Sequence, residues 1–97
     1  MIAEGLPDAI FAASDLMARG ALRTLRSAGV RVPEEVAVVG FDDSQVALST
    51  DPQLTTMRQP SFAQGEQMAS ILLDLLAGRQ PQHVTILDTE LIVRGSV

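Results

Sequence analysis

The sequence predicts an α/β domain with a largely parallel sheet and flanking helices. Three observations favour this fold class. Short apolar segments alternate with helical patterns along the chain. The segment 36–41 is apolar and rich in β-branched residues, as is typical of a central strand covered on both faces. The segment 16–28 instead places apolar residues three and four positions apart, as an amphipathic helix does.

Composition narrows the function classes. The chain has 97 residues, at most one domain, and its 46% apolar and 20% charged residues are typical of a globular protein. Twelve acidic against seven basic residues give a net charge of −5, which disfavours direct contact with DNA or an anionic membrane. There is no cysteine, which excludes a disulfide scaffold or thiol nucleophile. All seven basic residues are arginine, which excludes lysine-dependent chemistry.

The first strand and helix follow from local signals. Residues 9–13 form a short continuous apolar run, which favours a buried strand. Ser14 and Asp15 come next, and both are good helix N-cap residues. The predicted helix 16–28 ends before Gly29, where a C′ glycine is expected.

The middle of the chain predicts two further strands. The polar face of the first helix carries three arginines (Arg19, Arg23 and Arg26). They are expected to face solvent or, alternatively, to form an oligomer contact. The central strand at 36–41 is followed by about one helical turn at 45–48. Residues 54–59 predict the next strand, and Pro60 ends it.

The C-terminal part predicts a helix and two short strands. Ser61 and Gln64 fit a capping box, and the helix that they begin ends at Gly78. Residues 83–87 and 91–94 predict short strands, whose order in the sheet is left open.

Hydrogen-bonding side chains follow each of the first three strands. Ser14 and Asp15 follow the first, Asp42 and Asp43 the second, and Gln59 stands at the end of the third. Ligands of open parallel sheets bind outside the carboxyl ends of the strands. We therefore expect these side chains to line one polar crevice.

Carboxylates accept hydrogen bonds from neutral donors, so sugar hydroxyls or nucleobase N–H groups suit such a crevice better than an anion does. Structural alternatives stay open. Ser14 can be only an N-cap, Asp15 only a favourable charge at a helix N-terminus, and Asp42 only a structural hydrogen-bond acceptor. Asp43 is expected to cap the short turn after it.

Catalytic patterns are missing from the sequence. It contains no G-x-S-x-G, GxxxxGK[ST] or G-x-G-x-x-G. The aspartate pair after the central strand is compatible with a phosphate-accepting or metal-assisted site, but the first needs a lysine and the second a third carboxylate. We expect no catalytic residue, metal or cofactor, and no enzyme.

Several stretches together carry a family resemblance. Their order and spacing match across nearly the whole chain: PDAIFAASD at 7–15, GAL at 20–22, VPEEVAVVGFDD at 32–43, LTTMRQP at 54–60, and Gly65. In these stretches the chain closely resembles the LacI/GalR family of bacterial transcription regulators.

The resemblance implies part of a periplasmic-binding-protein-like (type I) effector domain, in which a small molecule binds in a cleft between two α/β subdomains. It implies residues 1–59 in the C-terminal subdomain, 60–87 in the N-terminal subdomain, and 88–97 as a final strand crossing back. The DNA-binding headpiece is absent, and the chain resembles the C-terminal third of such a regulator.

The resemblance also implies partners and a location. The effector is a sugar or nucleobase-like molecule, and the protein is a cytoplasmic homodimer with no membrane contact. Operator DNA is bound by the helix-turn-helix headpiece and not by this segment.

Residue roles follow from the same resemblance. Asp42 is implied to contact the ligand, Ser14 and Asp15 to line the same cleft, and Gln59 to lie near it, at the crossing between subdomains. The helix after Asp15 and the loop 48–50 are implied to lie toward the dimer interface. A sugar-binding transport protein of the same fold is the alternative, although the VPEE and LTTMRQP motifs favour the regulator.

Overall fold

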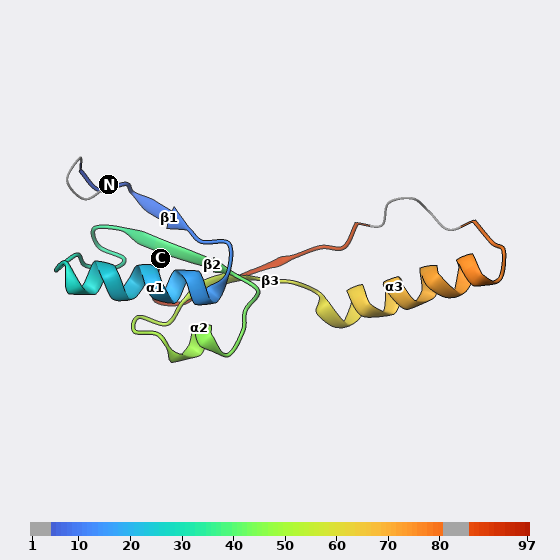
Figure 1. Ribbon diagram of the computed structural model, residues 1–97. Helices are drawn as coiled ribbons and strands as arrows, with labels where there is room; N and C mark the ends of the chain where they lie inside the picture. Colours follow the sequence, from blue (N-terminus) through green and yellow to red (C-terminus); the bar gives the residue numbers. More distant parts are fainter. Residues whose placement is uncertain (1–4, 81–85) are drawn as a thin grey trace. The chain divides into compact units, whose positions relative to one another are not determined.

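The computed structural model describes residues 5–80 and 86–97 and contains a four-stranded sheet (Figure 1). The chain divides into two compact units. The first comprises Met1–Arg58 and Glu90–Val97, and the second comprises Gln59–Thr89. All four strands belong to the first unit.

The sheet is mostly parallel. Its order is β1 (Ala9–Phe11), β2 (Ala37–Phe41), β3 (Thr55–Arg58) and β4 (Glu90–Ile92). The first three strands run parallel, with Ala9 opposite Ala37 and Val39 opposite Thr55. Only β4 is antiparallel, with Leu91 opposite Met57. The predicted fold class is therefore confirmed, and the last strand is the one that departs from the parallel order.

The helix α1 (Asp15–Ser27) begins and ends where its sequence signals indicate. The Ser14 hydroxyl accepts a 3.2 Å hydrogen bond from the Met17 backbone N–H, as expected of an N-cap. Gly29, just beyond the helix, has a φ of +74°, which favours glycine. The three arginines predicted on the polar face are all exposed (Arg19, Arg23 and Arg26).

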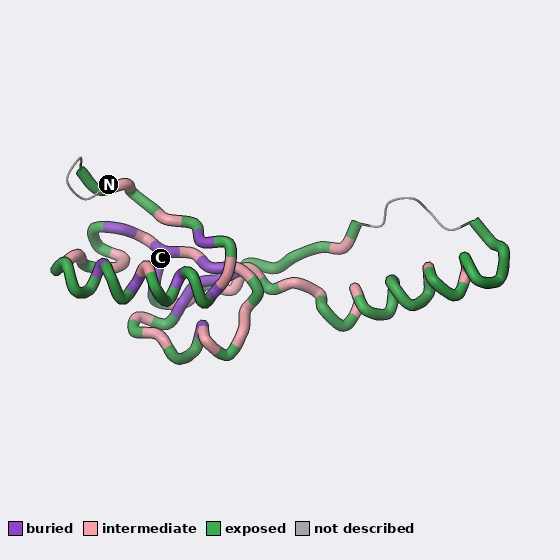
Figure 2. The backbone as a smooth tube through the Cα atoms, viewed as in Figure 1, coloured by how far each residue is buried: buried purple, intermediate pink, exposed green. Residues whose placement is uncertain are grey.

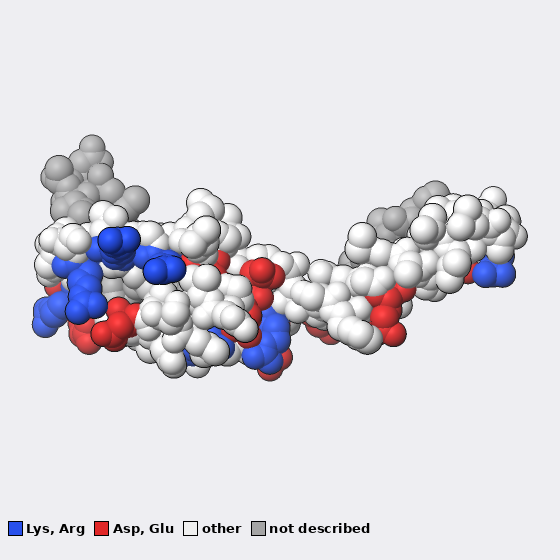
Figure 3. Space-filling view, turned by 60° about the horizontal axis from the view of Figure 1, so that its bottom comes forward, with Lys and Arg blue, Asp and Glu red and all other residues white. Residues whose placement is uncertain are grey.

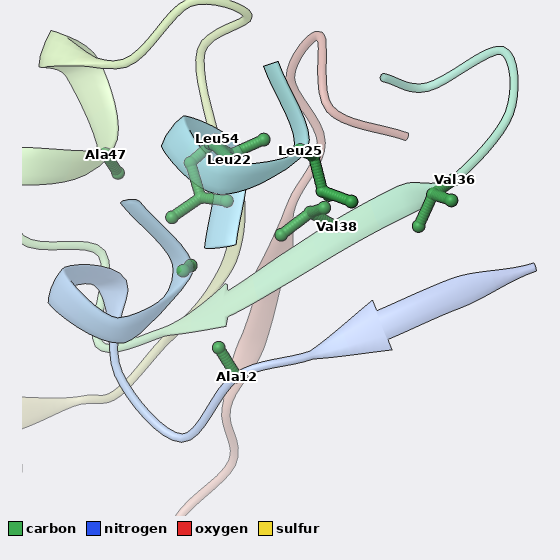
Figure 4. Close-up of a cluster of buried hydrophobic side chains, with 8 residues drawn as sticks. Ala12, Leu22, Leu25, Val36, Val38, Ala47 and Leu54 are labelled. Atoms are coloured by element: carbon green, nitrogen blue, oxygen red, sulfur yellow. The ribbon is translucent and has the colours of Figure 1, made fainter. Parts of the chain in front are cut away.

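The core of the first unit lies between α1 and the sheet. Apolar side chains from α1, β2 and the neighbouring segments point toward one another in Figure 4. The short helix α2 (Val46–Ser49) adds Ala47 to this cluster. The fully or nearly fully buried members are Ala12, Ala18, Leu22, Leu25, Val36, Val38, Ala47 and Leu54.

Two burial predictions are wrong. The run 9–13 was expected to form a buried strand, but only Ala9–Phe11 is a strand, and Phe11 is 65% exposed. The reason is its place at the edge of the sheet, beside β2 alone. The strand β2 was expected to be covered on both faces, but it alternates between buried Val38 and half-buried Val39 (Figure 2). Only the face toward α1 is fully covered.

The second unit is built around α3 (Ser61–Leu76). None of its 16 residues is buried. The predicted capping box is wrong because Pro60, not Ser61, is the N-cap: the Pro60 carbonyl accepts the Gln64 N–H, so Ser61 already lies inside the helix. Of the predicted strand 83–87, residues 83–85 lie outside the described residues, and 86–87 are not in a strand.

Candidate functional site

The carboxyl ends of β1, β2 and β3 lie at one edge of the sheet, because the three strands are parallel. Asp42 directly follows β2, and its backbone N–H donates a 2.8 Å hydrogen bond to the Met57 carbonyl of β3. The Asp42 residue is exposed. Its φ is +115° and that of Asp43 is +51°, so two successive non-glycine residues adopt the left-handed half of backbone space.

Asp43 forms ion pairs instead of capping the next turn, which corrects the sequence-based expectation. The Arg58 Nε–H donates to Asp43 Oδ2 at 2.7 Å, and the Arg94 Nη2–H donates to Oδ1 at 2.8 Å. The α2 N-cap is Gln45, without a side-chain cap. Burial acts to raise the pKa of the Asp43 carboxyl, but the hydrogen bonds and charges of Arg94 and Arg58 outweigh it and hold that pKa below its ordinary value.

Asp15 is buried, with 2% of its surface exposed, and lies at the centre of a second set of hydrogen bonds. Its Oδ2 accepts from the Ser44 backbone N–H at 2.6 Å and from the Ser44 hydroxyl at 3.0 Å. Its Oδ1 accepts from the Thr56 hydroxyl at 2.6 Å. Because Thr56 Oγ1 also accepts the Asp43 N–H at 3.2 Å, the two aspartates share this threonine.

Glycine is required at position 40 for this arrangement. A Cβ on Gly40 would collide with Oδ1 of Asp15 and would lie 2.7 Å from Cδ2 of Leu54. The absence of a side chain in β2 therefore lets the buried carboxylate approach the strand.

The other two predicted site residues are placed differently. Ser14 is half-buried at the start of α1, where its hydroxyl caps the helix. Gln59 belongs to the second unit, where its Oε1 accepts a 3.3 Å hydrogen bond from the Gln64 side chain. The structure thus brings Asp15, Asp42 and Asp43 to one edge within the first unit, joined through Ser44 and Thr56.

Thr56 and Arg94 complete this edge and were not predicted from the sequence. Arg94 follows β4 and is tied to the start of β3 and the residue before it by two further hydrogen bonds. Its backbone N–H donates to Thr55 Oγ1 at 2.8 Å, and its Nη1–H donates to the Leu54 carbonyl at 2.9 Å. No local signal identifies such partners, because Asp43 and Arg94 are 51 positions apart.

Figure 3 shows basic side chains gathered over the first unit, where six of the seven arginines lie, Arg79 alone being in the second. A hollow of about 380 Å³ lies there beside the end of α1, lined by Leu22, Arg26, Gly29, Val30, Arg31, Val32, Asp51 and Pro52. It includes none of the predicted ligand residues. The candidate site is therefore the polar edge itself, not this hollow.

Two kinds of feature are absent from residues 5–80 and 86–97. These residues contain no group of three or more histidine, cysteine, aspartate or glutamate residues placed to hold a metal ion. No helix among them is both long and apolar enough to cross a bilayer.

A mostly parallel sheet with acidic and hydroxyl side chains at the carboxyl ends of its strands defines an α/β protein, and in such proteins ligands bind at this edge of the sheet. The chain belongs to the periplasmic binding protein-like domain family, whose model matches residues 1–97.

Individual relatives are transcriptional regulators. The chain is 51% identical over 90 residues to the HTH-type transcriptional regulator CelR of Thermobifida fusca, covering 92% of this chain and 26% of that protein. The solved CelR–cellobiose complex matches with a TM-score of 0.85 and 50% identity, covering 93% of this chain and 28% of that one. The lac repressor dimer bound to operator and the anti-inducer ONPF matches with a TM-score of 0.90 and 34% identity. This match covers 99% of this chain and 34% of that one.

These relatives confirm the resemblance to LacI-type regulators that the sequence motifs indicated. The chain spans about a quarter of the length of CelR. CelR and the lac repressor are regulators and not enzymes, in agreement with the expectation for this chain.

Proposed function

We propose that this chain is the C-terminal part of the effector-binding region of a LacI-type transcriptional regulator. The observation that carries the proposal is the match to CelR in complex with cellobiose, at 50% identity over 93% of the chain. In this proposal the chain senses a small molecule, and a helix-turn-helix in another part of the protein binds operator DNA. The same relatives favour a regulator over a transport protein.

The proposed effector is an uncharged sugar, and we take cellobiose as the first candidate. Asp42 is exposed at the carboxyl edge of the sheet, and a carboxylate can accept hydrogen bonds from two neighbouring sugar hydroxyls. Ser14 and Gln59 are further proposed contacts. Asp15 contributes by holding Ser44 and Thr56, to which its oxygens are bonded.

We also propose that the two units correspond to parts of two subdomains. Residues 1–59 and 88–97 would belong to the C-terminal subdomain and 60–87 to the N-terminal one. The division of the chain into Met1–Arg58 with Glu90–Val97 and Gln59–Thr89 supports these boundaries to within two residues.

The proposed assembly is a cytoplasmic homodimer that needs no cofactor. The lac repressor match supports the dimer, because that structure is a dimer bound to operator. In this chain, α1 offers an exposed surface for the contact, with Leu16 66% and Met17 60% exposed.

Calorimetric titration of the full-length regulator with cellobiose tests the effector proposal. We expect saturable binding, and we expect Asp42→Asn to weaken it at least tenfold, because an amide cannot accept with both of its polar atoms. Glu34→Gln, an exposed change in the same unit, is the matched control and should bind as the wild type does. Equal binding by Asp42→Asn would remove Asp42 from the site.

A further inference from the structure

The backbone at the end of β2 is held in a conformation that is uncommon for residues other than glycine. Asp42 and Asp43 have φ values of +115° and +51° and are not glycine. Positive φ values are uncommon outside glycine, although aspartate adopts them more readily than most residues, and positions held there by surrounding contacts are concentrated at functional sites. The contacts around this segment are therefore informative about its role.

Each of three successive backbone N–H groups in this segment has a partner. The Asp42 N–H donates to the Met57 carbonyl at 2.8 Å, and the Asp43 N–H to Thr56 Oγ1 at 3.2 Å. The Ser44 N–H donates to Asp15 Oδ2 at 2.6 Å. The backbone on both sides of the Asp42 side chain is thus fixed to β3 and to the first residue of α1.

The Asp43 carboxylate adds a charged anchor. Its side chain is 9% exposed and that of Arg94 is 14% exposed, whereas that of Arg58 is 51% exposed. Arg94 is itself bound to Thr55 of β3 through its backbone N–H and to the preceding Leu54 carbonyl through its Nη1–H. The less exposed pair is therefore the stronger anchor, because solvent screens the Arg58 pair more.

We propose that Asp43 and Arg94 are positioning residues that fix the strained turn after β2 and thereby orient the Asp42 carboxylate toward the effector. This inference rests on the proposed function of Asp42. Asp43 directs its own carboxylate to two arginines and acts through the backbone that it shares with Asp42. Arg94, far away in sequence, connects the final segment of the chain to the effector site.

Hydrogen exchange and calorimetry on the full-length regulator test this role. In Arg94→Met we expect exchange at the Asp43 and Ser44 amides to rise at least tenfold, while the Leu22 and Leu25 amides in α1 stay protected. Cellobiose binding should weaken about tenfold. Arg94→Lys keeps the charge and should restore part of the amide protection and part of the cellobiose affinity. A purely structural role would change exchange in α1 equally and would not give this local pattern.

The control is Arg31→Met, which breaks an exposed ion pair with Glu35 in the same unit. It should change neither the amide exchange at residues 43 and 44 nor the affinity for cellobiose. If Arg94→Met does not fold, Asp43→Asn removes the same pair from the other side. Unchanged exchange at residues 43 and 44 in a folded variant would overturn the positioning role. Absence of cellobiose binding by the wild type would instead overturn the choice of effector. Hydrogen exchange at residues 43 and 44 would still decide whether Arg94 fixes the turn.

Discussion

At the scale of single residues, Gly40 allows the buried Asp15 carboxylate to lie against β2. A methyl group on residue 40 would meet both Asp15 Oδ1 and the buried Leu54 side chain. Overpacking of this kind costs about 1–3 kcal/mol. We therefore expect Gly40→Ala to destabilise the regulator by about 2 kcal/mol in urea unfolding followed by circular dichroism.

Gly20→Ala is the matched control for Gly40→Ala. Gly20 lies within α1, and a Cβ there would have no atom within 4 Å. Alanine is favoured over glycine in a helix by about 0.5–1 kcal/mol, so Gly20→Ala should stabilise the protein slightly. If both changes had the same sign and size, the close approach of Asp15 to β2 would not be the cause.

The second residue-scale prediction concerns pH. The Asp43 pKa lies below its ordinary value of 3.8 in the folded chain, so the native state binds fewer protons than the unfolded state near that pH. The stabilisation from ionised Asp43 is therefore fully present above that ordinary value. It is lost as the pH falls through the lower, folded-state pKa.

We expect the wild type to exceed Asp43→Asn in stability by about 2 kcal/mol at pH 7, since hydrogen bonds to charged groups are worth about 1.5–3 kcal/mol. The difference should stay near this value down to about pH 4 and narrow only as the pH falls further, through the lowered pKa of Asp43 in the folded state. Urea midpoints of both proteins across this range measure it. A difference that stays constant with pH would mean that Asp43 is not stabilised as a carboxylate.

At the scale of elements, the segment after β4 is fastened into the sheet through Ser96. This residue is fully buried: its hydroxyl donates to the Val38 carbonyl at 2.5 Å and accepts the Thr55 N–H at 2.8 Å. Its backbone carbonyl also accepts the Val38 N–H at 2.9 Å. Ser96 thus links β2 and β3 at the positions where these strands begin.

Removing the Ser96 hydroxyl should leave two buried backbone groups without that partner. A buried group left unsatisfied costs about 1–3 kcal/mol, so we expect Ser96→Ala to lower the stability by about 2 kcal/mol. Thermal melts of Ser96→Ala and of Ser49→Ala, an exposed serine on α2, provide the comparison. Similar melting temperatures for the two variants would mean that water replaces the Ser96 hydroxyl.

The elements also indicate how far the sequence alone can lead. The helix α1 was predicted with its cap and its C′ glycine because helical periodicity and capping are local signals. The exposure of β1 was not predicted, because a strand's place at a sheet edge depends on partners that are distant in sequence. The same holds for the site: Asp42 was placed after β2, but the pairing of Asp43 with Arg94 needed the fold.

At the scale of the whole molecule, the two units differ in how far they bury their apolar side chains. The first unit has a core of eight buried apolar residues, whereas α3 in the second buries none. Large apolar residues on α3 are more than half exposed: Phe62, Met68, Leu72, Leu73, Leu75 and Leu76. Exposed apolar residues concentrated on one helix in this way are typical of protein–protein contacts.

Because α3 lacks a cover among the described residues, we expect residues 1–97 on their own to self-associate at micromolar concentration. Sedimentation velocity should show species larger than a monomer that dissociate on dilution. Replacing Leu72 and Leu76 with glutamine should shift the distribution toward monomer, because it removes apolar area worth about 25 cal/mol per Å² buried. Replacing Arg19 and Arg23 with glutamine, on α1, is the control for a general change of surface and should leave the α3 contact intact. A single sharp monomer boundary for the unmodified chain, together with cooperative unfolding, would show that the exposed face of α3 needs no partner.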